Sequence, residues 1–195
     1  MSRTGEVKRT TKETEITASL ELDGSGKSDI DTGIGFFDHM LEGFARHGFF
    51  DLMLNCKGDL KVDGHHTVED CGIVLGQAIK KAVGDKAGIN RYGFFTLPMD
   101  DALITCAVDL CSRPYFSYDL VFPQDMCGDM DMSLVREFFY AVSCSGEMNL
   151  HLRMLSGLNS HHIAEAAFKA FSKALDMAVK TDPRIKDVLS TKGVL

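Results

Sequence analysis

The sequence predicts an α+β protein made of two similar halves, each a small β-sheet backed by helices on one face. A His-His-x-x-Glu run occurs at residues 65–69 and again at residues 161–165. The segments that precede each run also follow the same order of strand-like and helix-like patterns. We therefore expect a single domain over the whole chain, with repeats at about 9–92 and 93–182 and a C-terminal tail at 183–195.

Each half opens with a segment that predicts a strand. Residues Thr14–Leu22 alternate between apolar and polar side chains, and residues Ala102–Leu110 do the same. A period of two is typical of a strand that buries one of its faces.

A helix is predicted next in each half, at Ile34–Leu41 and at Met132–Phe139. Both stretches are apolar with a helix-like pattern. Gly48 and Gly146 come after them, and glycine there is a C-cap or turn signal.

A further strand and a second helix complete each half, so that each half is expected to read β–β–α–β–α with some extra short strands. The strands are expected at Asp51–Asn55 and Asn149–Arg153, and the helices run on from the two His-His-x-x-Glu runs. The last helix should end before Pro183, because proline cannot continue a helix.

Composition limits the classes of partner. The chain has 195 residues, 45% of them hydrophobic and 25% charged, which is ordinary for a globular protein. Its net charge of −7 argues against a nucleic-acid partner, which would need a basic face. No apolar run approaches the roughly 18 residues of a membrane helix, so no membrane partner is expected.

The sequence also carries expectations about location. Six cysteines without CxxC spacing indicate reduced thiols in a reducing compartment. Residues Met1–Glu6 lack an apolar signal core. We expect a cytoplasmic protein, or a plastid one if a transit peptide has been removed.

The paired histidines predict a metal centre. On a helix, residues three and four apart share a face, so each Glu lies beside the His pair of its own run. Adjacent helical residues point about 100° apart, so each pair should give one His to each of two metals. His39 and Glu137 precede the first His of a run by 26 and 24 residues, which marks them as matched further ligands. The expected metal ligands are His39, His65, His66, Glu69, Glu137, His161, His162 and Glu165.

The donor set limits which metal ions could bind but does not select one of them. Imidazole and carboxylate without thiolate suit Mn²⁺, Fe²⁺, Zn²⁺ or Co²⁺ and disfavour a structural zinc. Arg and Lys residues elsewhere in the chain would suit a phosphate, since Arg gives bidentate contacts and Lys a point charge.

Several stretches resemble the imidazoleglycerol-phosphate dehydratase family of histidine biosynthesis. The resemblance runs from about Arg9 to the C-terminus. The matching stretches are Gly35–Leu41, Gly64–Asp70, Asp85–Gly93, Pro98–Ala102, Ser112–Tyr115, Asn159–Glu165, Phe168–Phe171 and Ser190–Leu195.

The resemblance implies an assembly and a set of site residues. It implies two halves of one topology, trimers that assemble with Mn²⁺ into a 24-subunit shell, and active sites between subunits that hold two Mn²⁺. It supports all the metal ligands above except Glu137, where the family often has His; a carboxylate can still bind Mn²⁺. The predicted substrate contacts, to which we add His47 and Thr191, are Glu13, His47, Arg91, Arg113, Lys169, Ser190, Thr191 and Lys192.

Two further departures from the family concern the surroundings of these residues. Asp101 stands where the family usually has Glu, and Cys111-Ser112-Arg113 stands for Ser-Gly-Arg. The missing glycine is expected to alter the turn that presents Arg113, because glycine adopts backbone conformations that serine disfavours.

The implied reaction is loss of water from imidazole glycerol phosphate, which gives imidazole acetol phosphate. In this hypothesis the substrate's imidazolate bridges two Mn²⁺, and a nearby carboxylate or a metal-bound hydroxide takes the carbon-bound proton. Glu13 and Glu165 are the candidates, and the sequence does not choose between them. The phosphate would be anchored by Arg91, Arg113, Lys169 and Lys192.

Two other functions use the same donor types. A dinuclear metallohydrolase would act on a phosphate ester or an amide and release phosphate from generic esters. A metal-storage or metal-stabilised shell protein would assemble with metal but turn over no imidazole phosphate.

Overall fold

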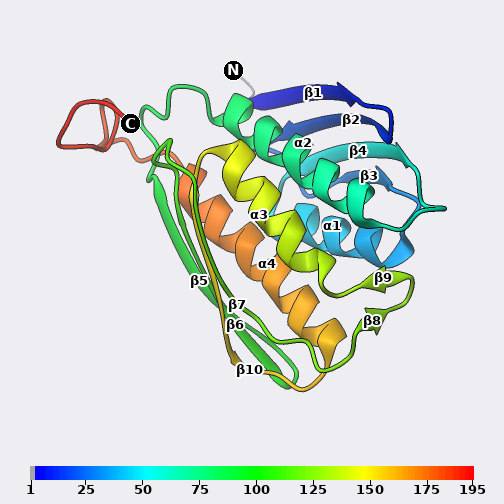
Figure 1. Cartoon of the computed structure of the whole chain (residues 1–195). Coiled ribbons are helices and arrows are strands. Elements are labelled where there is room, and N and C mark those ends of the chain that lie inside the picture. Colours follow the sequence, from blue (N-terminus) through cyan, green and yellow to red (C-terminus); the bar gives the residue numbers. More distant parts are fainter. Residues whose placement is uncertain (1–2) are drawn as a thin grey trace.

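The structure, a computed structural model, describes residues 3–195; Met1 and Ser2, part of the N-terminal stretch examined for a signal, lie outside the described residues. Over residues 3–195 the chain forms two four-stranded sheets with four helices between them (Figure 1). Each sheet carries its own two helices on one face, and the halves meet through these helices. Among the described residues, no helix combines the length and apolar character that crossing a bilayer requires.

The first half contains a sheet in the order β1-β2-β4-β3. Strands β1, β2 and β4 are antiparallel neighbours, and β3 runs parallel to β4. Helix α2 packs on β1 and β2, and helix α1 lies beside β3. The bounds are β1 (Thr4–Thr10), β2 (Thr14–Glu21), β3 (Ser28–Asp31), α1 (Gly35–Gly48), β4 (Asp51–Gly58) and α2 (His65–Val83).

The second half repeats this topology. Its sheet has the order β5-β6-β10-β7, in which β7 runs parallel to β10 and the other neighbours are antiparallel. A hairpin of β8 (Met126–Cys127) and β9 (Met130–Asp131) is inserted before α3. The bounds are β5 (Tyr92–Met99), β6 (Ala102–Asp109), β7 (Tyr115–Asp119), α3 (Leu134–Gly146), β10 (Asn149–Ser156) and α4 (Ser160–Val179). The expected duplicated α+β fold is confirmed.

Gly48 and Gly146 have a different role from the expected C-cap. Each is the last residue of its helix, and the left-handed residue is the next one, Phe49 at φ 60° or Glu147 at φ 50°. A Cβ on Gly48 would lie 2.3 Å from the ring of Phe50, and one on Gly146 would lie 2.4 Å from a methionine methyl group. Gly48 is therefore needed for close packing, whereas the methionine methyl group beside Gly146 ends a flexible side chain that could move aside. The C-cap prediction is wrong for both glycines, because the left-handed residue follows them.

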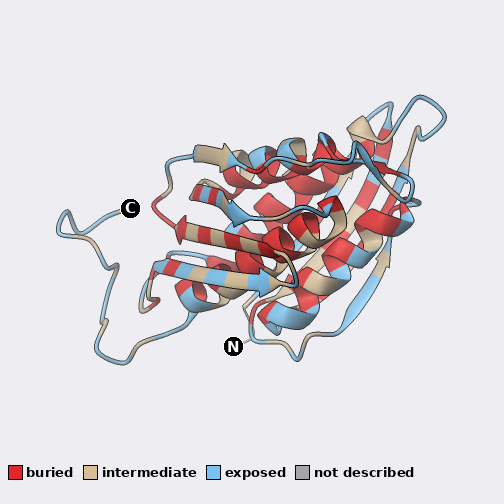
Figure 2. Cartoon of the chain, turned by 90° about the horizontal axis from the view of Figure 1, so that it is seen from below, coloured by how far each residue is buried: buried red, intermediate tan, exposed pale blue. Residues whose placement is uncertain are grey.

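Aromatic side chains fill the layer of helices between the two sheets. Phe138 of α3 stacks on Phe168 of α4 with ring centroids 5.0 Å apart, and Phe44 of α1 stacks on Phe171 of α4 at 5.5 Å. The helices are buried along the faces that meet, while strand surfaces and the tail are exposed (Figure 2). Burial of this apolar area holds α1 against α4 and α2 against α3. The helix pairing in turn decides which site residues meet.

Candidate metal and substrate site

One group of predicted ligands converges within the chain. The ligand atoms of His39 on α1 and of His161 and Glu165 on α4 all lie within 4.8 Å of one another. His161 Nε2 is 3.2 Å from a Glu165 carboxylate oxygen, and Phe36 packs edge-on against the His161 ring. His39 is 122 positions from His161 and 126 from Glu165 in sequence, and only the packing of α1 on α4 brings it to them.

Lys169 completes the polar surface of this cluster. Its Nζ lies 2.6 Å from the second oxygen of Glu165, one helical turn away on the same face. Burial alone would raise the pKa of the Glu165 carboxyl, but the hydrogen bond and charge of Lys169, with His39 and His161, set it below its usual range. Glu165 is therefore ionised at neutral pH, as a metal ligand must be.

His47 lies further along α1, beside the same cluster. Burial and the nearby charge of Lys169 lower its pKa, which favours the neutral ring at pH 7. It is two helical turns beyond His39, so it shares that face of α1. The structure thus brings His47 and Lys169 together with the metal-ligand candidates.

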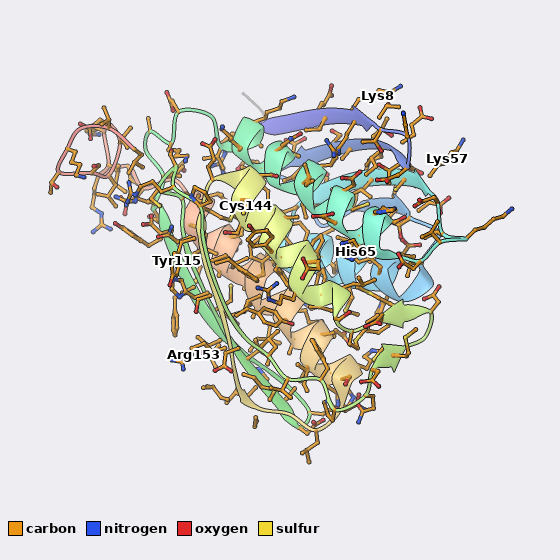
Figure 3. The ribbon with its side chains drawn as sticks, viewed as in Figure 1. Lys8, Lys57, His65, Tyr115, Cys144 and Arg153 are labelled. Carbon is orange, nitrogen blue, oxygen red and sulfur yellow. The ribbon has the colours of Figure 1, made fainter. Side chains whose placement is uncertain are left out.

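The corresponding residues of the other half are less closely assembled. His65 Nε2 is 3.8 Å from Glu69 on the same helix. Figure 3 marks His65 at the start of α2, next to α3, and it lines a cavity that Leu134 of α3 also borders. Glu137 of α3 pairs instead with Arg136 at 3.0 Å. Within residues 3–195, Glu137 does not join His65 and Glu69 in a three-ligand cluster, so its role as a ligand stays a prediction.

The start of each His-bearing helix is fixed by a matching polar contact. Asp63 accepts a hydrogen bond from the His65 backbone N–H, and Asn159 accepts one from the His161 backbone N–H. Asn159 is the N-cap of α4, where such an acceptor stabilises the helix start, whereas Asp63 lies one residue before Gly64, the N-cap of α2. Both halves therefore place the first His of the pair on the first helical turn.

The second histidine of each pair points in a different direction from the first, as expected. The rings of His65 and His66 have centroids 6.1 Å apart and planes at 88°, and the rings of His161 and His162 are 6.1 Å apart with planes at 74°. Adjacent histidines therefore face different places, which is the geometry that two separate metal positions require.

Carboxylates hold both of these second rings. His66 Nδ1 is 3.0 Å from Asp59, and its Nε2 is 3.8 Å from Glu13. The hydrogen bond that His66 donates to Asp59 raises the pKa of His66. Glu13, expected to contact substrate, is thus placed beside a predicted metal ligand.

The second half has the same arrangement. His162 Nδ1 is 2.6 Å from Asp101, and its Nε2 is 3.5 Å from Asp100. The hydrogen bond that His162 donates to Asp101 raises the pKa of His162, and this bond together with those from backbone N–H groups lowers the pKa of Asp101 to about 2.

The C-terminal tail lines an open cavity of about 870 Å³ at the opposite end of α4. Arg91 and Arg113 line it together with Ser190, Thr191 and Lys192. The tail is tied to the body by bridges from Ala87 and Ile89 to Val188 and Thr181. Five predicted substrate-binding residues therefore share one cavity.

The guanidinium of Arg91, which lines this cavity, already has hydrogen-bond partners within the chain. Its Nε and Nη2 donate to Asp109 at 2.7 and 3.0 Å, and its Nη1 donates to the Leu189 carbonyl at 2.8 Å. The hydrogen bond with Asp109 raises its pKa further. In this chain Arg91 fastens the tail to β6, and Arg113 and Lys192 are the more exposed cations.

Lys169 lies away from that cavity. Arg91 donates its backbone N–H to Ala178, nine positions after Lys169 on α4, which is about 14 Å of helix rise. The predicted phosphate contacts thus fall into two groups at separate places in one chain.

The turn before Arg113 adopts the conformation for which glycine was expected. Ser112 has φ 62°, in the left-handed region. Its Oγ accepts a hydrogen bond of 2.7 Å from Nζ of the buried Lys86. Serine is therefore retained at a strained backbone position with a polar partner that glycine could not provide.

Ser112→Gly is expected to lower stability although it relieves the backbone. Left-handed backbone costs a non-glycine residue about 1–2 kcal/mol, whereas a hydrogen bond to a charged group contributes about 1.5–3 kcal/mol and leaves a buried donor behind when lost. Ser112→Ala, which keeps the strain and loses the bond, should lower the urea midpoint more. A glycine variant more stable than wild type would show that the Lys86 contact contributes little.

The residues that sequence reasoning missed are all carboxylates: Asp59, Asp100, Asp101 and Asp109. Asp100 and Asp101 lay in a matching stretch, but nothing in their spacing showed which histidine they would meet. Asp100 has φ 47°, a left-handed conformation in the hairpin between β5 and β6. The contacts of Asp100 and Asp101 with His162 can be seen only in the tertiary structure, where β5 and β6 pack against α4.

The fold and the site together define a duplicated α+β protein whose helix starts display paired imidazoles and carboxylates. Such donors suit an enzyme that uses divalent cations. The chain belongs to the imidazoleglycerol-phosphate dehydratase family, whose sequence model matches residues 32–175. It is therefore a dehydratase of histidine biosynthesis, a hydro-lyase, and the resemblance seen in the sequence is confirmed.

Individual relatives agree with this assignment. The chain is 60% identical over 195 residues to imidazoleglycerol-phosphate dehydratase of Lachnoclostridium phytofermentans and 56% identical to that of Acetivibrio thermocellus, with 100% of each chain covered. The crystal structure of the Staphylococcus aureus enzyme matches with a TM-score of 0.83 at 37% identity, over 92% of this chain and 99% of that one. IGPD from Pyrococcus furiosus in complex with (S)-C348 matches with a TM-score of 0.84 at 38% identity, over 97% and 100%.

Proposed function

We propose that this dehydratase depends on two Mn²⁺ per active site and converts imidazole glycerol phosphate to imidazole acetol phosphate and water. The observation that supports it most is the convergence of His39, His161 and Glu165, whose ligand atoms lie within 4.8 Å. When bound, the two ions would supply Lewis-acid positions for the ring nitrogens of a bridging substrate imidazolate.

The residues present fit such ions. The cluster offers two imidazoles and an ionised carboxylate, a donor set that Mn²⁺ accepts. His65 with Glu69, and the Nε2 atoms of His66 and His162, provide further donors.

Glu13 is the carboxylate we propose for moving the carbon-bound proton. Glu165 has one oxygen on Lys169 and the other near His161, and its lowered pKa makes it a weaker base. Glu13 is half exposed on the loop between β1 and β2, 3.8 Å from His66. It can therefore reach a substrate held at that histidine.

The substrate's phosphate is proposed to bind in the tail cavity. Arg113 can form a bidentate contact, and Lys192 adds a point charge. This anchoring would hold the reacting carbons in place relative to Glu13.

We propose that a homo-oligomer completes the site, as trimers that assemble to a 24-mer. The metal cluster near Lys169 and the tail cavity near Arg91 lie at separate places along α4. A neighbouring chain that places its tail cavity beside this chain's cluster would join the two groups. The split distribution of site residues supports an oligomer of this kind.

Turnover of imidazole glycerol phosphate tests the function directly. The metal-stripped protein should be inactive, and added Mn²⁺ should restore product formation. Light scattering on the same samples should show larger particles with Mn²⁺. Release of phosphate from generic esters would instead indicate a hydrolase, and bound metal without any turnover would contradict the proposal.

Arg113→Ala should raise KM for the substrate strongly, by about 10-fold or more, while kcat changes less. A charge-assisted contact contributes about 1.5–3 kcal/mol, and each 1.4 kcal/mol corresponds to a factor of ten. Arg153→Ala is the matched control, because Arg153 faces solvent on β10 and pairs only loosely with Asp119 at 3.7 Å. Unchanged substrate binding in Arg113→Ala would remove it from the phosphate site.

A further inference from the structure

In each half, the second histidine of the pair lies between two carboxylates. His162 has Asp101 at its Nδ1, and His66 has Asp59 at its Nδ1. On the Nε2 side each ring faces another carboxylate, supplied by the hairpin loop that joins the first two strands of its half. The same device occurs twice, although the aspartates come from different places: Asp59 follows β4, and Asp101 precedes β6.

A carboxylate at Nδ1 determines where a neutral imidazole carries its proton. An ionised carboxylate only accepts hydrogen bonds, so the Nδ1 that faces it must donate. The lone pair is then on Nε2, which is the atom that can bind a metal.

We propose that Asp59 and Asp101 are positioning residues, which keep the proton of His66 and His162 on Nδ1 so that Nε2 of each ring is presented to the metal. This inference rests on the proposed metal-binding role of the two histidines. It assigns the carboxylates no contact with the substrate.

The two aspartates differ in how firmly they are held. The Oδ1 of Asp101 accepts from His162, while its Oδ2 accepts from the backbone N–H groups of Leu158 and Asn159. Both carboxylate oxygens of Asp59 lie near His66 Nδ1, at 3.2 and 3.0 Å, and the described contacts of this carboxylate include no backbone donor. Asp101 is therefore fixed in orientation, and Asp59 is free to turn.

This difference makes Asn substitutions unequal in the two halves. In Asp101→Asn, the one remaining oxygen must stay with the two backbone N–H groups, so the new NH₂ faces His162. That NH₂ can only donate, so Nδ1 must accept and the proton moves to Nε2, where it blocks the metal-binding lone pair. In Asp59→Asn, the amide can turn its oxygen to His66, and the ring keeps its proton on Nδ1.

The test is a Mn²⁺ titration of the metal-stripped full-length protein, with free Mn²⁺ followed by electron paramagnetic resonance. Asp101→Asn should weaken Mn²⁺ binding about 10–100-fold, the usual effect of losing an outer-shell partner. Asp59→Asn should stay within about 3-fold of wild type. Asp119→Asn, which alters an exposed carboxylate on β7, should bind as wild type does.

Asp101→Ala separates positioning from a structural role. Alanine removes the acceptor of two backbone N–H groups, so it should lower the urea midpoint, measured with chelator present, more than asparagine does. It leaves Nδ1 free to donate to water, so it should bind Mn²⁺ more tightly than Asp101→Asn. The order of the two variants is thus reversed between stability and metal affinity.

Other results would overturn the inference. If metal affinity followed stability, with Asp101→Ala the weaker binder, Asp101 would only cap the loop before α4. Wild-type affinity in Asp101→Asn would also contradict it. If the wild-type chain bound no Mn²⁺, the proposed metal dependence would fail first, and the inference with it.

Discussion

His161→Ala should lower kcat/KM by at least about 100-fold and reduce the Mn²⁺ bound per chain. His161 is the centre of the α1–α4 cluster, 3.2 Å from Glu165 and with its ring 5.9 Å from that of His39. Loss of an outer partner of a metal ligand already costs about 10–100-fold, so loss of a ligand should cost more. Steady-state kinetics and metal analysis of the purified variant measure both effects.

His151→Ala is the control for this experiment. His151 is exposed on β10, where its ring lies beside Tyr115 and away from the cluster. It should keep wild-type turnover and metal content. A fully metallated and active His161→Ala would take His161 off the ligand list and would move the metal site away from α1 and α4.

Gly93→Ala should lower the free energy of unfolding by at least about 3 kcal/mol. A Cβ on Gly93 of β5 would lie 1.7 Å from the backbone oxygen of Ala174 on α4, so strand and helix would have to separate. Overpacking against backbone is at the costly end of core substitutions. Gly5 of β1 meets Ala78 of α2 in the same way, at 2.0 Å, so the contact is repeated in both halves.

Gly43→Ala is the matched control for this substitution. A Cβ on Gly43 of α1 would meet nothing within 4 Å, so alanine should stabilise the helix by up to about 1 kcal/mol. Urea unfolding of both variants, followed by circular dichroism with chelator present, compares the midpoints. Equal midpoints for Gly93→Ala and wild type would mean that α4 can move away from β5 without loss.

Local spacing was sufficient to predict the duplication, the four helices and the strands β2, β4, β6 and β10. It gave no position for β1, β3, β5, β7 or the β8–β9 hairpin. The alternation of β2 and β6 and the helices that start at His65 and at Ser160 follow from periods that neighbouring residues set. The family resemblance also lay in short runs of sequence, and it is confirmed. The metal ligands themselves stay predictions that the Mn²⁺ experiments test.

The sequence by itself thus determined which residues carry imidazole and carboxylate groups and on which helical face they lie. Tertiary structure decided which of them meet. His39 lies beside His161 because aromatic packing holds α1 against α4. Asp101 reaches His162 because β6, which follows Asp101, pairs with β10, and β10 leads into the loop before α4. These contacts join residues 61 to 126 positions apart, and no local period encodes such distances. They follow from burial of apolar surface, which depends on the whole chain.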